Sequence, residues 1–292
     1  MTDAIRTYED NDEATEAWNG PLYERWVEFR DVVVAGLAQH GELAMMARPP
    51  KQGDDVLDIG CGLGDTTARL GELVGPNGSA YGVDIAERMI ETAAAEQSSE
   101  NVSFAVMDVQ YGSFDRTFDY AYARFGTMFF ANPVAALRNV RSALTPGGVL
   151  NMVVWRQKPD NDWLHRAEVA TKKYLDEPPP EETDEPTCGP GPFSMAGGDV
   201  TSGILVSAGF ERITLERCDL PFRIGDDMAG AVAFMEAIGP AAEVLRLSGA
   251  AADELRPTIE RELEAALADF QQPDGSVIAP SSTWFVSARN PG

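Results

Sequence analysis

The 292-residue chain has few cysteines and few histidines. Its three cysteines, Cys61, Cys188 and Cys218, stand far apart, and neither His40 nor His165 has a cysteine nearby. A structural zinc site needs closely spaced pairs of ligands, and an odd number of cysteines does not form a disulfide framework. We therefore expect neither structural zinc nor a disulfide-stabilised fold, and the sequence predicts no bound metal.

Basic residues are also scarce. The chain has 23 lysines and arginines against 47 aspartates and glutamates, which gives a formal net charge of −24 at pH 7. This average charge repels DNA, RNA and anionic membrane surfaces, and the basic residues are scattered rather than clustered. We expect a small-molecule substrate, with no nucleic-acid and no membrane partner, and we interpret the acidity as favouring solubility.

The sequence contains no apolar run long enough to cross a membrane. Its first twenty residues are acidic and polar, whereas a secretory signal is basic and then apolar. A cytoplasmic location is therefore expected. Hydrophobic residues make up 44% of the chain, which is enough for a sizeable buried core.

The pattern of apolar residues divides the chain into parts. Residues 1–48 are predicted to form an N-terminal tail and an amphipathic cover helix that begins at Pro21. From Val56 onward, within a core at residues 49–156, short apolar segments alternate with helical segments. Such alternation favours right-handed crossovers and a parallel sheet that is covered on both faces. The fold class is therefore predicted to be α/β.

This alternation ends after Trp155. Residues 157–200 include a proline-rich acidic stretch and are predicted to be a loop or insertion. Residues 201–292 are predicted to complete the fold, with a helical insertion at 227–270 and a last strand at 281–289. The inserted helices either close over the substrate or pair with a second subunit in a homodimer.

The segment VLDIGCGLGDTT joins a strand to a helix through three glycines. Gly60, Gly62 and Gly64 allow a sharp turn and the close approach of a ligand, although a purely structural turn would use them too. Asp84 ends the next strand about twenty residues later, where a carboxylate can accept both hydroxyls of a ribose. Asp108 ends the third strand at the same sheet edge. Together these residues favour a nucleotide-type ligand.

The residue sequence of the glycine loop discriminates between such ligands. A phosphate-binding P-loop ends in Gly-Lys-Ser/Thr, but this loop ends in Gly-Asp-Thr. An NAD loop is spelled G-x-G-x-x-G, and Asp65 at the helix entrance would repel a pyrophosphate. A ligand with adenine and ribose but no phosphate fits better. S-adenosylmethionine (SAM) is such a ligand, because acids can hold its ammonium and its sulfonium is cationic.

A series of motifs resembles that of the class I SAM-dependent methyltransferases, in particular the ubiquinone/menaquinone-biosynthesis-like group. The motifs span about residues 50–156 and are VLDIGCGLGDTT, YGVDIAERMIETA, VSFAVMDV, FDYAYARFGTMFF and LTPGGVLNMVVWR. The resemblance implies a Rossmann-like fold, with a seven-stranded, mostly parallel sheet, an antiparallel last strand and helical cover insertions. It also implies methyltransferase activity with SAM as cofactor, S-adenosylhomocysteine (SAH) as product, and no metal.

The resemblance further implies which residues bind the cofactor. They are Asp58, Gly60, Cys61, Gly62, Gly64, Asp84, Ile85, Met89, Asp108, Val109, Arg124 and Phe125. The glycines would pass under the methionine moiety, Asp84 would bind the ribose, and Asp108 would accept from the adenine amino group. Arg124 and Phe125 would face the sulfonium and the substrate. The turn departs from many relatives at Leu63, where they carry Thr or Ser.

The acceptor is predicted to be small and apolar or aromatic, and to be methylated on oxygen or carbon. Large apolar side chains gather outside the strands, and those expected to line the substrate are Trp26, Met128, Phe129, Trp155 and Trp163. Methylation of an alcohol or a carbon acid usually needs a base. The candidate catalytic residues are His165, which could instead be a surface or capping histidine, and Arg124. We interpret His40 as structural.

Two other functions stay open. The chain could be a SAM- or SAH-binding module without catalysis, because no base is obvious in its sequence. An NAD-dependent oxidoreductase is disfavoured by the spelling of the glycine loop.

Overall fold

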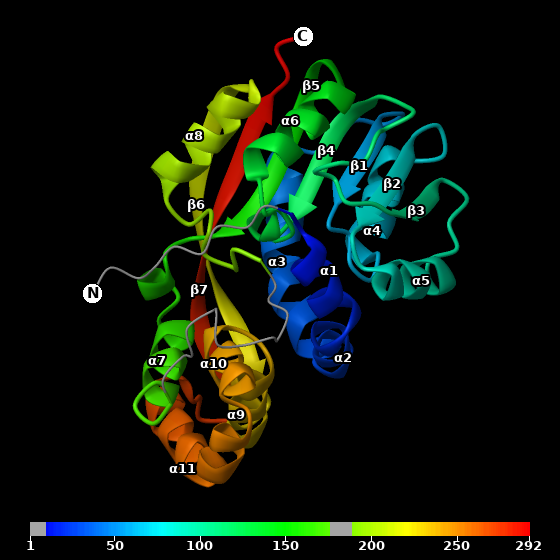
Figure 1. The fold of residues 1–292 in the computed structure, drawn as a ribbon. Helices are drawn as coiled ribbons and strands as arrows, with labels where there is room; N and C mark the ends of the chain where they lie inside the picture. The colour runs from blue at the N-terminus through cyan, green and yellow to red at the C-terminus, as the bar shows by residue number, and fades with distance from the viewer. Residues whose placement is uncertain (1–9, 176–188) are drawn as a thin grey trace.

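The structure is a computed structural model, and it describes residues 10–175 and 189–292. Its centre is a seven-stranded sheet with the order β3-β2-β1-β4-β5-β7-β6 (Figure 1). The strands are β1 (Asp55–Ile59), β2 (Ser79–Asp84), β3 (Val102–Val106), β4 (Phe118–Arg124), β5 (Leu144–Trp155), β6 (Glu211–Gly225) and β7 (Val277–Arg289). Strands β1 to β5 run parallel, and β7 pairs antiparallel with both β5 and β6. The predicted fold class is confirmed.

The strand order reverses direction in the middle of the sheet. From β1 the chain moves outward to β2 and β3, then returns to β4 and moves the other way to β5. The connecting helices are α4 (Asp65–Val74), α5 (Glu87–Glu96) and α6 (Pro133–Ala143). Because parallel crossovers are right-handed, α4 and α5 cover one face and α6 covers the other. A crevice therefore opens between β1 and β4 at the carboxyl ends of the strands, where ligands of such folds bind.

The N-terminal region differs from the expected tail and single helix. It forms α1 (Asp12–Asn19), α2 (Pro21–Glu28) and α3 (Arg30–Ala47), with a break at Phe29. The acidic composition suggested a tail, but Ala14 and Ala17 form a buried stripe that holds α1 against the domain. Residues 1–9 of the predicted tail lie outside the described residues.

The long antiparallel strands β6 and β7, which we call the hairpin, are joined by helices rather than by a short turn. The pairing of β7 with β6 continues beyond the end of β5, from Thr283 opposite Cys218 to Val277 opposite Gly225. Helices α7 (Asp162–Thr171), α9 (Met228–Ala237), α10 (Pro240–Ser248) and α11 (Ala250–Leu267) gather around this end of the hairpin (Figure 1). We call these four helices the cover. The remaining short elements are α8 (Gly198–Ala208), η1 (Thr127–Phe129), η2 (Lys158–Asp160) and η4 (Ala268–Phe270).

Helix α3 packs closely against the hairpin at Gly36. A Cβ atom added there would lie 1.8 Å from Cε2 of Phe222, a β6 side chain that is only 2% exposed. The close approach of helix and strand therefore requires a residue without a side chain at this position.

We predict that Gly36→Ala lowers the free energy of unfolding by about 1–3 kcal/mol, because the new methyl group overpacks the contact with Phe222. Gly203→Ala in α8 is the control, since a Cβ at Gly203 meets no atom within 4 Å. That substitution should raise stability by up to about 1 kcal/mol through helix propensity. Urea unfolding measures both, and equal shifts of the two midpoints would contradict the packing argument.

Candidate active site

The glycine turn between β1 and α4 has one residue that faces open space. Gly60, Gly62 and Gly64 have φ values of 66°, 53° and 81°, in the left-handed region that favours glycine. A Cβ at Gly60 would lie 3.0 Å from Cα of Gly126, and one at Gly64 would lie 2.8 Å from the Phe104 ring. At Gly62 a Cβ would meet nothing within 4 Å. The outer glycines serve packing, and the middle one leaves room for a ligand.

Asp84 ties this turn to the end of β2. Its Oδ2 accepts a hydrogen bond from the Gly62 amide at 2.9 Å, and its Oδ1 accepts one from the Ala86 amide at 2.9 Å. Burial raises the pKa of Asp84, and these backbone donors oppose that shift. Because each carboxylate oxygen can accept about two hydrogen bonds, both retain capacity for a ligand hydroxyl.

Asp58 lies beneath the turn and is 1% exposed. Burial raises its pKa to about 7, although Thr67 Oγ1 donates to its Oδ2 at 2.7 Å and opposes the shift. The folded protein therefore holds this carboxyl proton more tightly than the unfolded chain does. Stability from this group is fully present below the ordinary pKa of 3.8 and is lost as the pH rises to about 7.

We predict that the pH dependence of unfolding changes in Asp58→Asn. Relative to the variant, the wild-type protein should lose stability between pH 5 and about 7, with a slope approaching about 1.4 kcal/mol per pH unit. Above that range the difference should level off. Urea midpoints measured from pH 5 to 8 test this, with Asp226→Asn as the control because its side chain is 92% exposed. Parallel profiles for wild type and Asp58→Asn would contradict the assignment.

Arg124 pairs with the acid at the entrance of α4. Its guanidinium lies 2.8 Å from the Asp65 carboxylate, and its side chain is only 13% exposed. The pair borders a cavity of about 350 Å³, and the other residues that line this cavity belong to α3 and α4. The negative charge of Asp65 is thus partly neutralised, which weakens the expectation that it alone would repel a pyrophosphate. Arg124 points toward α4 rather than standing free in the crevice.

Phe125 takes a strained backbone conformation directly after β4. Its φ is 60°, which is rare for a large side chain, and its amide donates to Val153 O at 2.9 Å. This conformation places the Phe125 ring centroid 4.5 Å from that of Trp155 at the end of β5. Met128 joins them, because its Sδ accepts from the Trp155 amide at 3.3 Å. We call Phe125, Met128 and Trp155 the aromatic wall.

The strain at Phe125 predicts an unusual order of stability for two variants. Phe125→Ala and Phe125→Gly both remove the ring contact with Trp155, but only glycine adopts the left-handed conformation without cost. Phe125→Gly should therefore be more stable than Phe125→Ala by about 1 kcal/mol. Urea unfolding of the pair is the measurement, and an alanine variant at least as stable as the glycine variant would refute the strain.

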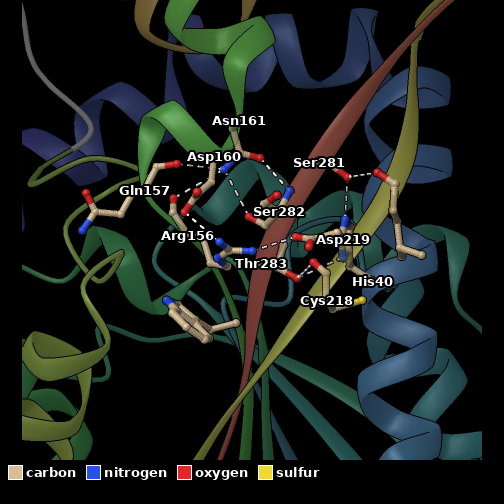
Figure 2. Close-up of polar contacts among 12 residues, drawn as sticks. His40, Arg156, Gln157, Asp160, Asn161, Cys218, Asp219, Ser281, Ser282 and Thr283 are labelled. Atoms are coloured by element: carbon tan, nitrogen blue, oxygen red, sulfur yellow. Dashed lines mark hydrogen bonds and ion pairs between the residues drawn. The ribbon is translucent and has the colours of Figure 1, made fainter.

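His40 lies inside α3, fully buried behind the aromatic wall. Figure 2 shows its ring between Ser281 and Thr283 of β7. Nε2 lies 2.7 Å from the Ser281 hydroxyl oxygen, and Nδ1 lies 3.0 Å from the Thr283 hydroxyl oxygen. The same two hydroxyls also reach carbonyl oxygens of β6, Ser281 that of Leu220 and Thr283 that of Cys218, so both ring nitrogens of His40 are tied to β7 and, through it, to β6. Burial lowers the pKa of His40 to about 4. The side chain is a neutral structural link in the middle of α3, in agreement with its structural interpretation.

The cover is attached by a second polar network that sequence reasoning missed. Asn161, just before α7, donates to Ser282 O at 3.1 Å and accepts from the Ser282 amide at 2.8 Å. Arg156 pairs with Asp219 at 2.8 Å and with Asp160 at 3.1 Å (Figure 2). An ordinary Asn or Arg in a loop carries no sequence signal of such a role.

The structure does not bring His165 and Trp163 to the glycine turn. Both lie on α7, which packs against α10 and α11 in the cover. The Trp163 ring is 2% exposed and stands 5.2 Å from Phe222 and 6.4 Å from Phe234, centroid to centroid. Trp163 therefore builds the core of the cover, and His165 is half-buried on the same helix.

Trp26 and Met89 belong to a different cluster over the outer side of the turn. Met89 packs with Leu63 and Ala86, and Trp26 lies on this group together with other aromatic residues of α1 and α2. Phe129 joins the cluster through Trp18, with a ring centroid distance of 5.3 Å. The predicted substrate-lining residues are thus divided among the aromatic wall, this cluster and the cover.

The remaining predicted cofactor residues lie along the same crevice edge. Cys61 and Val109 are buried, and Ile85 is half-buried directly after Asp84. Burial raises the pKa of the Cys61 thiol, so this cysteine is not activated as a nucleophile. Cys218 is also a free thiol, and Cys188 lies outside the described residues.

Residues 10–175 and 189–292 include no group of three or more His, Cys, Asp or Glu side chains that could hold a metal ion. No single helix among them is long and apolar enough to cross a membrane, although α9 and α10 meet the criteria of length and composition as a pair bent by 64°.

An open, mostly parallel sheet with a glycine turn after β1 and acids at the ends of β2 and β3 is a Rossmann-like fold, a class in which ligands bind at the carboxyl ends of the strands. Comparison with known proteins narrows this class, because the family described as methyltransferase domain matches residues 56–148. The resemblance to the class I SAM-dependent methyltransferases of the quinone-biosynthesis type is thereby confirmed for this part of the chain.

Individual relatives match over the same region. Aklanonic acid methyltransferase DauC of Streptomyces sp. (strain C5) is 39% identical over 103 residues, which are 34% of this chain and 47% of that protein. Demethylmenaquinone methyltransferase of Staphylococcus aureus (strain JH9) is 35% identical over 102 residues, or 34% of this chain and 42% of that protein. The match therefore spans less than half the length of either curated relative.

A solved structure shares the fold over most of the chain. A Bacillus halodurans C-125 protein superposes with a TM-score of 0.55 at 17% identity, covering 88% of this chain and 100% of that one. At this identity the likeness shows a common fold.

Proposed function

We propose that the chain is a SAM-dependent methyltransferase that methylates oxygen or carbon of a small apolar or aromatic acceptor. The observation that carries the proposal is the open space at Gly62, in a turn whose other two glycines are packed against neighbouring atoms. Asp84 is hydrogen-bonded to Gly62 and retains acceptor capacity, so a ribose beside the turn would find its partner in place.

The residues of the crevice fit the cofactor in order along the sheet edge. Asp108 after β3 would accept from the adenine amino group, and Asp84 after β2 would bind the ribose. Asp58 and the Arg124–Asp65 pair would serve the charged methionine end. When bound, SAM supplies a methyl group that its sulfonium has already activated.

The main task of the protein is then to align the acceptor and to exclude water. The aromatic wall is a buried apolar layer next to the turn, and burial keeps His40 behind it uncharged above about pH 4. No positive charge on His40 thus opposes the cationic methyl donor. Two relatives named for aklanonic acid and demethylmenaquinone support a quinone-type acceptor.

His165 has no role in proton transfer in this mechanism, because it lies on α7 within the cover. We further propose that the acceptor is a cytoplasmic small molecule rather than a nucleic acid or a membrane component. The formal charge of −24 supports this, since it disfavours polyanionic partners.

Binding of SAH tests the cofactor assignment. We expect saturable binding by calorimetry, weakened more than about tenfold in Asp84→Asn, because a hydrogen bond to a charged acceptor is worth about 1.5–3 kcal/mol. Asp226→Asn is the matched control, since its carboxylate is 92% exposed. NAD should not bind detectably, and equal SAH affinity in Asp84→Asn and wild type would exclude the ribose role.

Transfer of label from methyl-labelled SAM to a panel of phenols and quinols tests the reaction. Label in the acceptor supports methyl transfer. Saturable SAH binding with no transfer to any member of the panel would favour the alternative, a SAM- or SAH-binding module without catalysis.

A further inference from the structure

Asn11 connects the two sides of the crevice at its adenine end. The residue directly precedes α1 and is 4% exposed. Its Nδ2 lies 3.0 Å from both carboxylate oxygens of Asp108, in the loop after β3. Its Oδ1 accepts from the amide of Ala131 at 2.9 Å, in the segment after β4. A single carboxamide thus bridges loops that follow strands on either side of the switch point.

These bonds fix the orientation of the Asp108 carboxylate. Besides Asn11, the Gln110 amide donates to Oδ1 of Asp108 at 2.8 Å. Gln110 is itself held, because its Oε1 accepts from the Asn132 amide at 2.8 Å. A donor centred between both oxygens prevents rotation of the carboxylate about its bond to Cβ. Of about four acceptor positions, the two on Oδ1 are then taken, and Oδ2 keeps one for a ligand amino group.

A second asparagine holds the other end of α1 without touching Asp108. Asn19 Oδ1 accepts from the Arg88 amide at 3.2 Å, at the start of α5, and the Arg88 side chain donates to Asn19 O at 3.2 Å. Between the two ends, Trp18 packs on Trp26 with a centroid distance of 5.5 Å. Helix α1 is therefore anchored at both ends, but only the Asn11 anchor acts on the acid expected to read the base.

We propose that Asn11 is a positioning residue for adenine recognition, which holds the Asp108 carboxylate so that it selects a base with an amino group. This inference rests on the proposed SAM site. Adenine presents an amino donor to a carboxylate, whereas hypoxanthine presents a carbonyl oxygen that the carboxylate repels. Discrimination of this kind depends on a fixed acceptor, because a carboxylate free to turn toward water neither rewards the amino group nor penalises the carbonyl.

The test compares SAH with S-inosylhomocysteine, in which hypoxanthine replaces adenine. Calorimetry gives the Kd of both ligands for wild type, Asn11→Ala and Asn19→Ala, with the full chain in each case. We expect wild type to prefer SAH, and Asn11→Ala to reduce that preference by about tenfold, the equivalent of one hydrogen bond to a charged group. Asn19→Ala also loosens α1, and it should weaken both ligands by the same factor and leave the ratio unchanged.

Asn11→Leu serves as a second variant, because leucine has the same branched side chain of four non-hydrogen atoms and so leaves no cavity beside Asp108. It should show the same loss of preference as Asn11→Ala. An unchanged SAH to S-inosylhomocysteine ratio in both Asn11 variants would reduce Asn11 to a structural anchor and overturn the inference.

Tighter SAH binding in the Asn11 variants would overturn the inference in another way, by showing that the asparagine occupies the place of the adenine amino group. A wild-type protein that binds neither ligand would overturn the proposed cofactor itself. These outcomes separate failure of the Asn11 assignment from failure of the proposed function.

Discussion

The right-handedness of parallel crossovers is the constraint on which the rest of the structure depends. The chain enters the sheet at its centre, builds outward to β3, and must return to the centre before it can build in the other direction. Because each crossover has the same hand, this reversal puts helices on opposite faces and leaves the carboxyl ends of β1 and β4 uncovered. The glycine turn, Asp84, Asp108 and Phe125 follow four neighbouring strands and therefore share one edge.

The cover lies beyond the end of β5 because the pairing of β7 with β6 continues past Trp155, the last residue of β5. Strand β7 pairs antiparallel with both β5 and β6, and its pairing with β6 extends past the end of β5; α9, α10 and α11 lie in the connection between β6 and β7. Helix α3 fixes the base of this extension through Gly36 against Phe222 and through His40, whose two nitrogens are both bonded to β7. The position of the cover at the far end of β6 and β7 thus follows from one strand and one helix.

Much of the core could be predicted from sequence, because its signals are local. Alternating apolar strands and helices, a glycine turn and an acid at the end of the following strand each occupy a few consecutive residues. This is why Asp58, Asp84 and Asp108 were expected at one sheet edge and are found there. The antiparallel last strand rested on family resemblance rather than on periodicity, because alternation alone does not give a strand its direction.

The parts that sequence did not reveal depend on contacts between distant residues. The acidic composition of residues 12–19 is typical of a tail, but their alanines are buried against the domain. Nothing in the local sequence links Asn11 to Asp108, which is 97 residues away. Trp163 was expected at the substrate because aromatic residues gather in loops, but the cover has its own core and needs a large ring there. His165 lies on α7 with Trp163, and His40 of α3 is the residue whose ring lies beside the aromatic wall.

The distribution of charge in the crevice agrees with the cationic ligand that the proposed function requires. Asp58, Asp65 and Asp84 lie around the turn, and Asp65 forms an ion pair with Arg124. Burial raises the pKa values of Asp58 and Asp84, which means that holding negative charge here costs free energy in the folded protein. A ligand that brings an ammonium and a sulfonium offsets that cost, whereas a pyrophosphate adds to it. Under the proposed function, the buried acids of β1 and β2 would disfavour a dinucleotide, which is a stronger reason than the partly neutralised Asp65.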